Sequence, residues 1–95
     1  MDAKAAAAWS DNEKIFEKAV YDRQQGDEFD QSCVFFSRLT GIELHVNYST
    51  VGILPTTETP KDLVRIRDWY KVNKSRLYWD EATGTVNVRP GQNED

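Results

Sequence analysis

The sequence predicts a single α+β domain with a mainly helical N-terminal half, followed by a further helix and a C-terminal β-hairpin. A length of 95 residues, 39% of them hydrophobic, is enough for one core and too short for two. Helix-capping residues precede apolar residues at helical spacing in several places, and a glycine-containing turn separates two strand-forming runs near the end. We expect residues 1–8 to be disordered or frayed, residues 9–90 to form the domain, and residues 91–95 to be a disordered acidic tail.

The first two helices are expected on either side of Gly26. Ser10 and Glu13 have the spacing of a capping box, and apolar residues continue at helical spacing to about Asp22. After Gly26, Asp27 can cap a second helix. Its buried face would consist of Phe29, Cys33, Phe36 and Leu39.

The C-terminal part begins with a helix capped by Thr59, with Pro60 in its first turn, that continues to about Asn73. Residues 52–58 are expected to form the loop before it. The hairpin pairs residues 77–80 with residues 85–88, and Gly84 can take the positive φ that its turn requires.

Residues 42–51 allow two interpretations. Apolar and polar residues alternate from Ile42 to Ser49, which is typical of a half-buried strand. Thr40 and Glu43 could instead form a capping box, with Leu44, Tyr48 and Val51 on one helical face. The local pattern supports both.

The N-terminal half resembles a SANT/Myb-like three-helix domain over residues 9–51. The residues that carry the resemblance are Trp9, Ser10, Glu13, Phe16 and residues 17–22 for the first helix, Asp27, Phe29, Cys33 and Phe36 for the second, and Thr40, Leu44, Tyr48 and Val51 for the third. The third helix would offer no lysine or arginine to DNA phosphates. The resemblance therefore implies a SANT-type module that binds protein in a transcription or chromatin complex.

Positive charge is concentrated in one segment of an acidic chain. Residues 61–76 carry a net charge of +4, whereas the whole chain carries −4. In a winged-helix-like arrangement this segment could bind nucleic acid phosphates. The candidate residues are Lys61, Arg65, Arg67, Lys71, Lys74 and Arg76. The same residues could also form only the solvated face of an amphipathic helix.

Two other groups of residues suggest a protein partner. Asp27, Glu28 and Asp30 form an acidic cluster that could meet a basic protein. Trp69 lies off the centre of its helix's apolar face, and Tyr78 faces away from its neighbours on the strand, so both are candidate exposed anchors. A small acidic phage or bacterial inhibitor or immunity protein is a third hypothesis.

Catalysis finds little support in the sequence. No carboxylate or thiol is placed beside the single histidine, His45, as a nucleophile and its base would be. We expect a non-catalytic protein without cofactor, metal or small-molecule substrate, and with a buried Cys33. No signal peptide or membrane-spanning run is seen, which favours an intracellular protein, nuclear or cytoplasmic.

Overall fold

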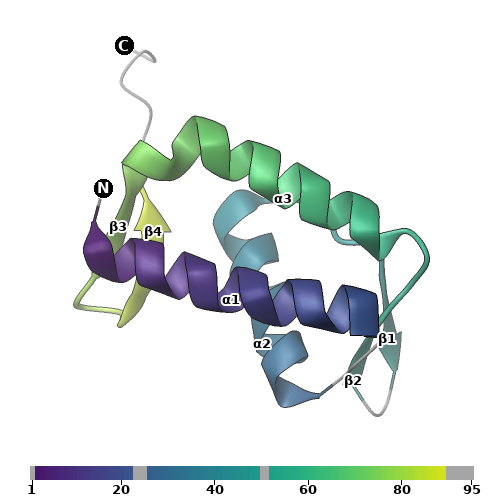
Figure 1. Ribbon diagram of the computed structural model, residues 1–95. Coiled ribbons are helices and arrows are strands. Elements are labelled where there is room, and N and C mark those ends of the chain that lie inside the picture. Colours follow the sequence, from purple (N-terminus) through teal and green to yellow (C-terminus); the bar gives the residue numbers. More distant parts are fainter. Residues whose placement is uncertain (1, 23–25, 50–51, 90–95) are drawn as a thin grey trace.

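The computed structural model describes residues 2–22, 26–49 and 52–89. These residues confirm the predicted α+β class (Figure 1). The elements, in chain order, are α1 (Ala3–Asp22), α2 (Asp27–Thr40), β1 (Val46–Ser49), β2 (Gly52–Pro55), α3 (Thr59–Asn73), the short 3-10 helix η1 (Lys74–Arg76), β3 (Leu77–Asp80) and β4 (Thr85–Val88). None of the described helices is both long enough and apolar enough to cross a membrane.

Helix α1 begins seven residues before the predicted capping box, so the expectation of a frayed segment before residue 9 was wrong. Asp2 caps the helix, because its Oδ1 accepts hydrogen bonds from the backbone N–H groups of Lys4 and Ala5. The alanines that follow have the highest helix propensity of any residue, and Ala5 is fully buried. Ser10 therefore lies inside the helix rather than at its start.

Helix α2 ends where Gly41 takes a left-handed conformation, with φ of 74°. Thr40 is the last residue of this helix, and its hydroxyl donates to the Phe36 carbonyl oxygen instead of capping a new helix. The residues from Val46 to Ser49 then form strand β1, so the third helix implied by the SANT/Myb resemblance is not formed by them. Of the two interpretations of this segment, the strand is confirmed for Val46–Ser49, whereas residues 42–45 form neither a strand nor a helix. Val51 lies outside the described residues.

Strand β1 pairs with β2 in an antiparallel register that places Tyr48 opposite Ile53. The prediction of a loop over residues 52–58 was therefore wrong for Gly52–Pro55. Strands β3 and β4 form a second, separate two-stranded sheet. A winged helix would pair the first strand with the C-terminal hairpin, and this fold does not do so in the described residues.

The C-terminal part follows the prediction closely. Helix α3 ends at Asn73, and strands β3 and β4 have the predicted bounds and pair Trp79 with Val86. Gly84 has φ of 66°, as the turn requires. Glu58 rather than Thr59 is the residue that precedes the helix. The expected acidic tail over residues 91–95 lies outside the described residues.

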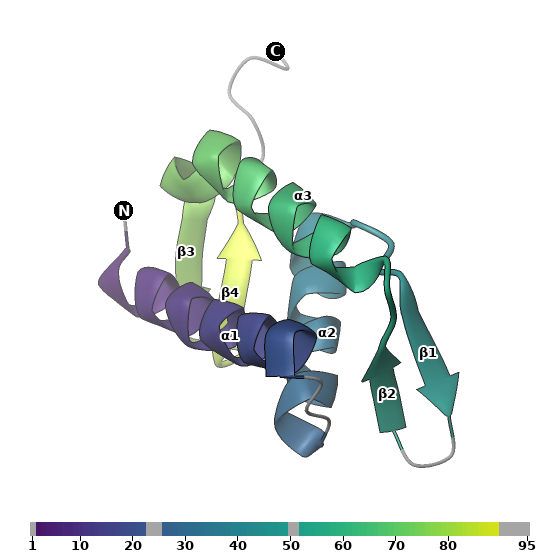
Figure 2. The same ribbon diagram turned by 45° about the vertical axis from the view of Figure 1, so that its right-hand side comes forward.

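The core is centred on Trp9 of α1, which is buried. Its ring lies 4.8 Å from that of Phe36 on α2 and 4.6 Å from that of Tyr70 on α3. Helices α1 and α3 both pack on α2, which lies between the two hairpins (Figure 2). Each hairpin therefore has one side against the helices and one side facing outward.

Candidate interaction surfaces

The basic residue at the centre of α3 is used inside the fold. Arg67 Nε donates to Glu13 Oε2 over 2.9 Å, and Arg67 Nη2 donates to Glu17 Oε2 over 3.0 Å. These hydrogen bonds raise the pKa of Arg67 above its ordinary value. The side chain is 38% exposed and joins α3 to α1. Arg67 is thus a link between two helices.

Most of the other basic residues proposed for nucleic acid binding also have partners within the protein. Lys61 pairs with Glu58 over 2.9 Å, and Lys71 lies 4.0 Å from Asp68. Arg76 donates to Asn73 Oδ1 and to the Arg89 carbonyl oxygen. Lys74 is exposed on η1. Of the six predicted residues, the lysines Lys61, Lys71 and Lys74 remain exposed, and Lys61 lies apart from the other two, at the start of α3.

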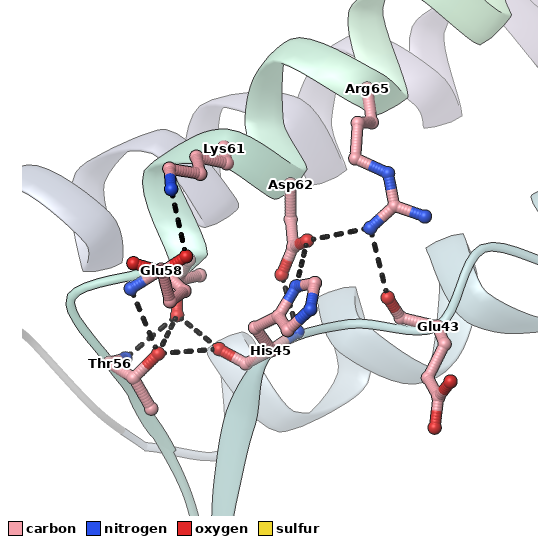
Figure 3. Close-up of polar contacts among 8 residues, drawn as sticks. Glu43, His45, Thr56, Glu58, Lys61, Asp62 and Arg65 are labelled. Atoms are coloured by element: carbon pink, nitrogen blue, oxygen red, sulfur yellow. Dashed lines mark hydrogen bonds and ion pairs between the residues drawn. The ribbon is translucent and has the colours of Figure 1, made fainter.

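A buried carboxylate anchors the start of β1 to α3 (Figure 3). Asp62 is fully buried, and its oxygens accept hydrogen bonds from the backbone N–H of His45, from His45 Nδ1 over 2.8 Å, and from Arg65 Nη1 over 3.1 Å. Arg65 Nη1 also donates to the Glu43 carbonyl oxygen. Sequence reasoning missed this cluster because His45 and Asp62 are 17 residues apart.

Two threonines complete this attachment from the other side of His45. The hydroxyl groups of Thr56 and Thr59 both donate to the His45 carbonyl oxygen, over 2.8 and 2.6 Å. They therefore bind the backbone and leave the imidazole to Asp62. Among the described residues, this aspartate–histidine pair has no hydroxyl or thiol bonded to the histidine ring, so the arrangement fixes a strand rather than activating a nucleophile.

The acidic cluster of α2 is divided by the fold. Asp27 and Glu28 are exposed at the N-terminal end of the helix. Asp30 instead accepts a hydrogen bond from the backbone N–H of Ile53 over 2.9 Å, and so belongs to the contact between α2 and β2. The prediction that all three carboxylates form one binding surface was wrong for Asp30.

Asp27 and Glu28 line a groove between the C-terminal half of α1 and the start of α2. Its volume is about 180 Å³. Ile15, Ala19 and Phe29 supply its apolar surface, and Lys18 also lines it. Two carboxylates beside an apolar surface suit a side chain with an aliphatic stem and a positively charged end.

The two aromatic residues proposed as exposed anchors are partly buried. Trp69 stacks on Trp9, with ring centroids 5.7 Å apart and planes inclined by 10°. The guanidinium of Arg89 lies 5.1 Å from the Tyr78 ring centroid. Among the described residues, the exposed large apolar side chains are different ones, namely Tyr21, Val34, Tyr48, Val64 and Val72. Tyr48 on β1 is 75% exposed.

The described residues contain no group of three or more histidine, cysteine, aspartate or glutamate side chains placed to hold a metal ion. No protein-family model matches the chain, and no curated protein or solved structure is significantly similar to it.

Proposed function

We propose that this protein is a non-catalytic binding module whose partner is a protein with a basic segment. The observation that carries the proposal is the groove between α1 and α2, where the exposed carboxylates of Asp27 and Glu28 adjoin an apolar surface. A lysine or arginine of the partner would pack its stem on Ile15, the partly exposed apolar residue of the groove, and place its charge near the two carboxylates. A small acidic inhibitor is a module of this kind, whereas a SANT-type domain would need a third helix where this fold has strand β1.

The pairing of the basic side chains supports a protein partner over nucleic acid. A phosphate contact by Arg67 would have to replace two ion pairs that join α3 to α1. A contact by Arg65 would weaken the compensation of a buried carboxylate. Of the six residues predicted to contact nucleic acid, the three exposed lysines could reach phosphates without such a cost, and so few contacts give weak binding.

Fluorescence anisotropy with defined probes tests the proposal. The probes are a labelled peptide of alternating arginine and leucine, a DNA duplex and a single-stranded RNA, each titrated at low salt and at about 0.15 M salt. We expect the peptide to bind and both nucleic acids to remain free at the higher salt concentration. Nucleic acid binding that is lost in the Lys71→Ala/Lys74→Ala variant would overturn the proposal.

A matched pair of variants locates the peptide site. Asp27→Asn/Glu28→Gln removes the two carboxylates beside the groove and should weaken peptide binding about fivefold, which corresponds to about 1 kcal/mol. Asp11→Asn/Asp68→Asn removes the same charge from exposed positions elsewhere and should change the affinity less than about twofold. Equal losses in both variants would show attraction by net charge alone.

A further inference from the structure

The outer edges of the two hairpins differ in how their backbone groups are occupied. In an antiparallel pair, every second residue of a strand points its N–H and C=O away from the other strand. Such outward groups can pair with a further strand unless something covers them. In this protein the register of each hairpin, together with the hydrogen bonds of the Ile53 and Arg89 N–H groups, identifies which residues point outward.

Three of the four edges are engaged by other parts of the chain. On β3, the outward N–H of Trp79 donates to Asp2 Oδ2 over 3.0 Å. On β4, the outward carbonyl oxygen of Val86 accepts a hydrogen bond from Arg38 Nη2 over 2.8 Å. On β2, the outward N–H of Ile53 donates to Asp30, and Pro55, two residues later, has no N–H to offer.

Strand β1 is the exception among the described strands. Because the N–H of Ile53 points away from β1, the groups of Tyr48 directly opposite must point away from β2, and those of Val46 follow two residues earlier. Figure 2 shows β2 between β1 and α2, so that this edge faces outward. No described residue provides a hydrogen bond to the outward groups of Val46 or Tyr48.

The composition of the hairpin leaves this edge unprotected. Residues 46–57 contain no charged residue, in a chain that is 29% charged. Natural proteins commonly place lysine or proline on an open edge to prevent pairing with another chain. The base of β1 is also held rigidly, because both backbone groups of His45 are bonded to the start of α3 or the residues before it.

We propose that β1 pairs antiparallel with β1 of a second copy of this protein. With Asn47 on a two-fold axis, Tyr48 of one copy lies opposite Val46 of the other, and each such pair exchanges two backbone hydrogen bonds. The exposed Tyr48 ring then covers the partner's Val46, a cross-strand aromatic and β-branched pair. The two hairpins become one four-stranded sheet, and the uncharged edge is complementary to itself.

The proposed pairing of two β1 strands does not depend on the groove at Asp27 and Glu28. The effect of salt distinguishes this self-association from binding of a basic partner in the groove. Each copy carries a net charge of −4, so screening should strengthen self-association, whereas it should weaken binding of a basic partner. The contact involves short strands, so we expect a dimer with a micromolar to millimolar dissociation constant.

Sedimentation equilibrium of the full chain over a wide concentration range tests the proposal. The wild type should shift from monomer toward dimer as concentration rises. Tyr48→Pro removes an outward N–H without removing a bond to β2, and should raise the dissociation constant at least tenfold. Tyr48→Thr keeps that N–H and should raise the dissociation constant of the dimer less. A wild type that stays monomeric, or a dimer that Tyr48→Pro leaves intact, would overturn the proposal.

A cross-linking variant tests the register even if Tyr48→Pro fails to fold. The two Asn47 residues would be directly opposite, with Cα atoms about 4.5 Å apart, which is within disulfide range. Asn47→Cys should therefore give a covalent dimer with oxidised glutathione. The control variant is Val72→Cys, because the Val72 side chain on α3 is 77% exposed. It should give far less covalent dimer. Equal cross-linking of both variants would overturn the two-fold pairing. The pairing would also be overturned if this edge of β1 were covered by a strand of a different protein and not by a second copy.

Discussion

Replacing Asp62 with alanine should lower the free energy of unfolding by about 3 kcal/mol. The carboxylate is fully buried and accepts three hydrogen bonds, from the backbone and ring of His45 and from Arg65. A hydrogen bond to a charged group contributes about 1.5–3 kcal/mol. The side chains of His45 and Arg65 are 55% and 46% exposed. When the Asp62 carboxylate is removed, water can therefore replace much of the hydrogen bonding that these two side chains lose.

The backbone N–H of His45 donates to a carboxylate that is fully buried, so the expected loss exceeds that of a surface ion pair. For a domain of this size, 3 kcal/mol corresponds to a fall in Tm of about 12–24 °C. Urea unfolding followed by circular dichroism measures the free energy, and hydrogen exchange shows whether the β1–β2 hairpin opens first. Asp62→Asn keeps one oxygen acceptor and should give an intermediate loss.

Asp68→Ala is the matched control, because this exposed aspartate lies on the same helix, 4.0 Å from Lys71. It should change the free energy of unfolding by less than about 0.5 kcal/mol. If Asp62→Ala cost less than about 1 kcal/mol, with hairpin exchange unchanged, the attachment of β1 to α3 through Asp62 would be refuted.

Three further predictions concern single residues. Arg67→Gln should cost about 1 kcal/mol, and less at high salt, because it breaks two ion pairs to α1, whereas Lys71→Gln should cost almost nothing in the same urea titration. Burial raises the pKa of Cys33 from 9.0 to about 12, so the contribution of this thiol to the free energy of unfolding is fully present below pH 9.0 and declines as pH rises toward 12. Cys33→Ala should flatten this decline, and an equal slope in both proteins would contradict the prediction. Hydrogen bonds from the backbone N–H of Trp79, and next from that of Ala5, lower the pKa of Asp2 below 3.8. The stabilisation that the Asp2 carboxylate provides is therefore present above pH 3.8 and is lost as pH falls through the lowered pKa. Tm measured from pH 5 to pH 2.5 should show a smaller fall for Asp2→Asn than for the wild type.

Sequence reasoning succeeded where local chemistry determines the structure. The proline near the start of α3 and the glycine of the C-terminal turn both act within a few residues, and the elements they predict are present. It failed at Ser10, because the alanine run before this residue extends the helix and Asp2 provides a better cap. It also missed β2, whose pairing depends on β1 rather than on its own residues.

The functional surfaces were harder to predict because their contacts are distant in the chain. Arg67 is 54 residues from Glu13, so its charge looked available to phosphates when it is not. Asp30 looked like part of an acidic surface but bonds to the backbone of a strand 23 residues away. The open edge of β1 did leave a sequence signal, since residues 46–57 contain no charge.

Whether the protein binds a basic protein partner through Asp27 and Glu28 is tested most directly by affinity capture with matched baits. Wild type, Asp27→Asn/Glu28→Gln and Asp11→Asn/Asp68→Asn are immobilised and exposed to nuclease-treated lysate, and the captured proteins are quantified by mass spectrometry. We expect a basic protein to be retained by the wild type and the control variant and depleted on Asp27→Asn/Glu28→Gln. Equal retention by all three baits, or retention that requires intact nucleic acid, would contradict the proposed function.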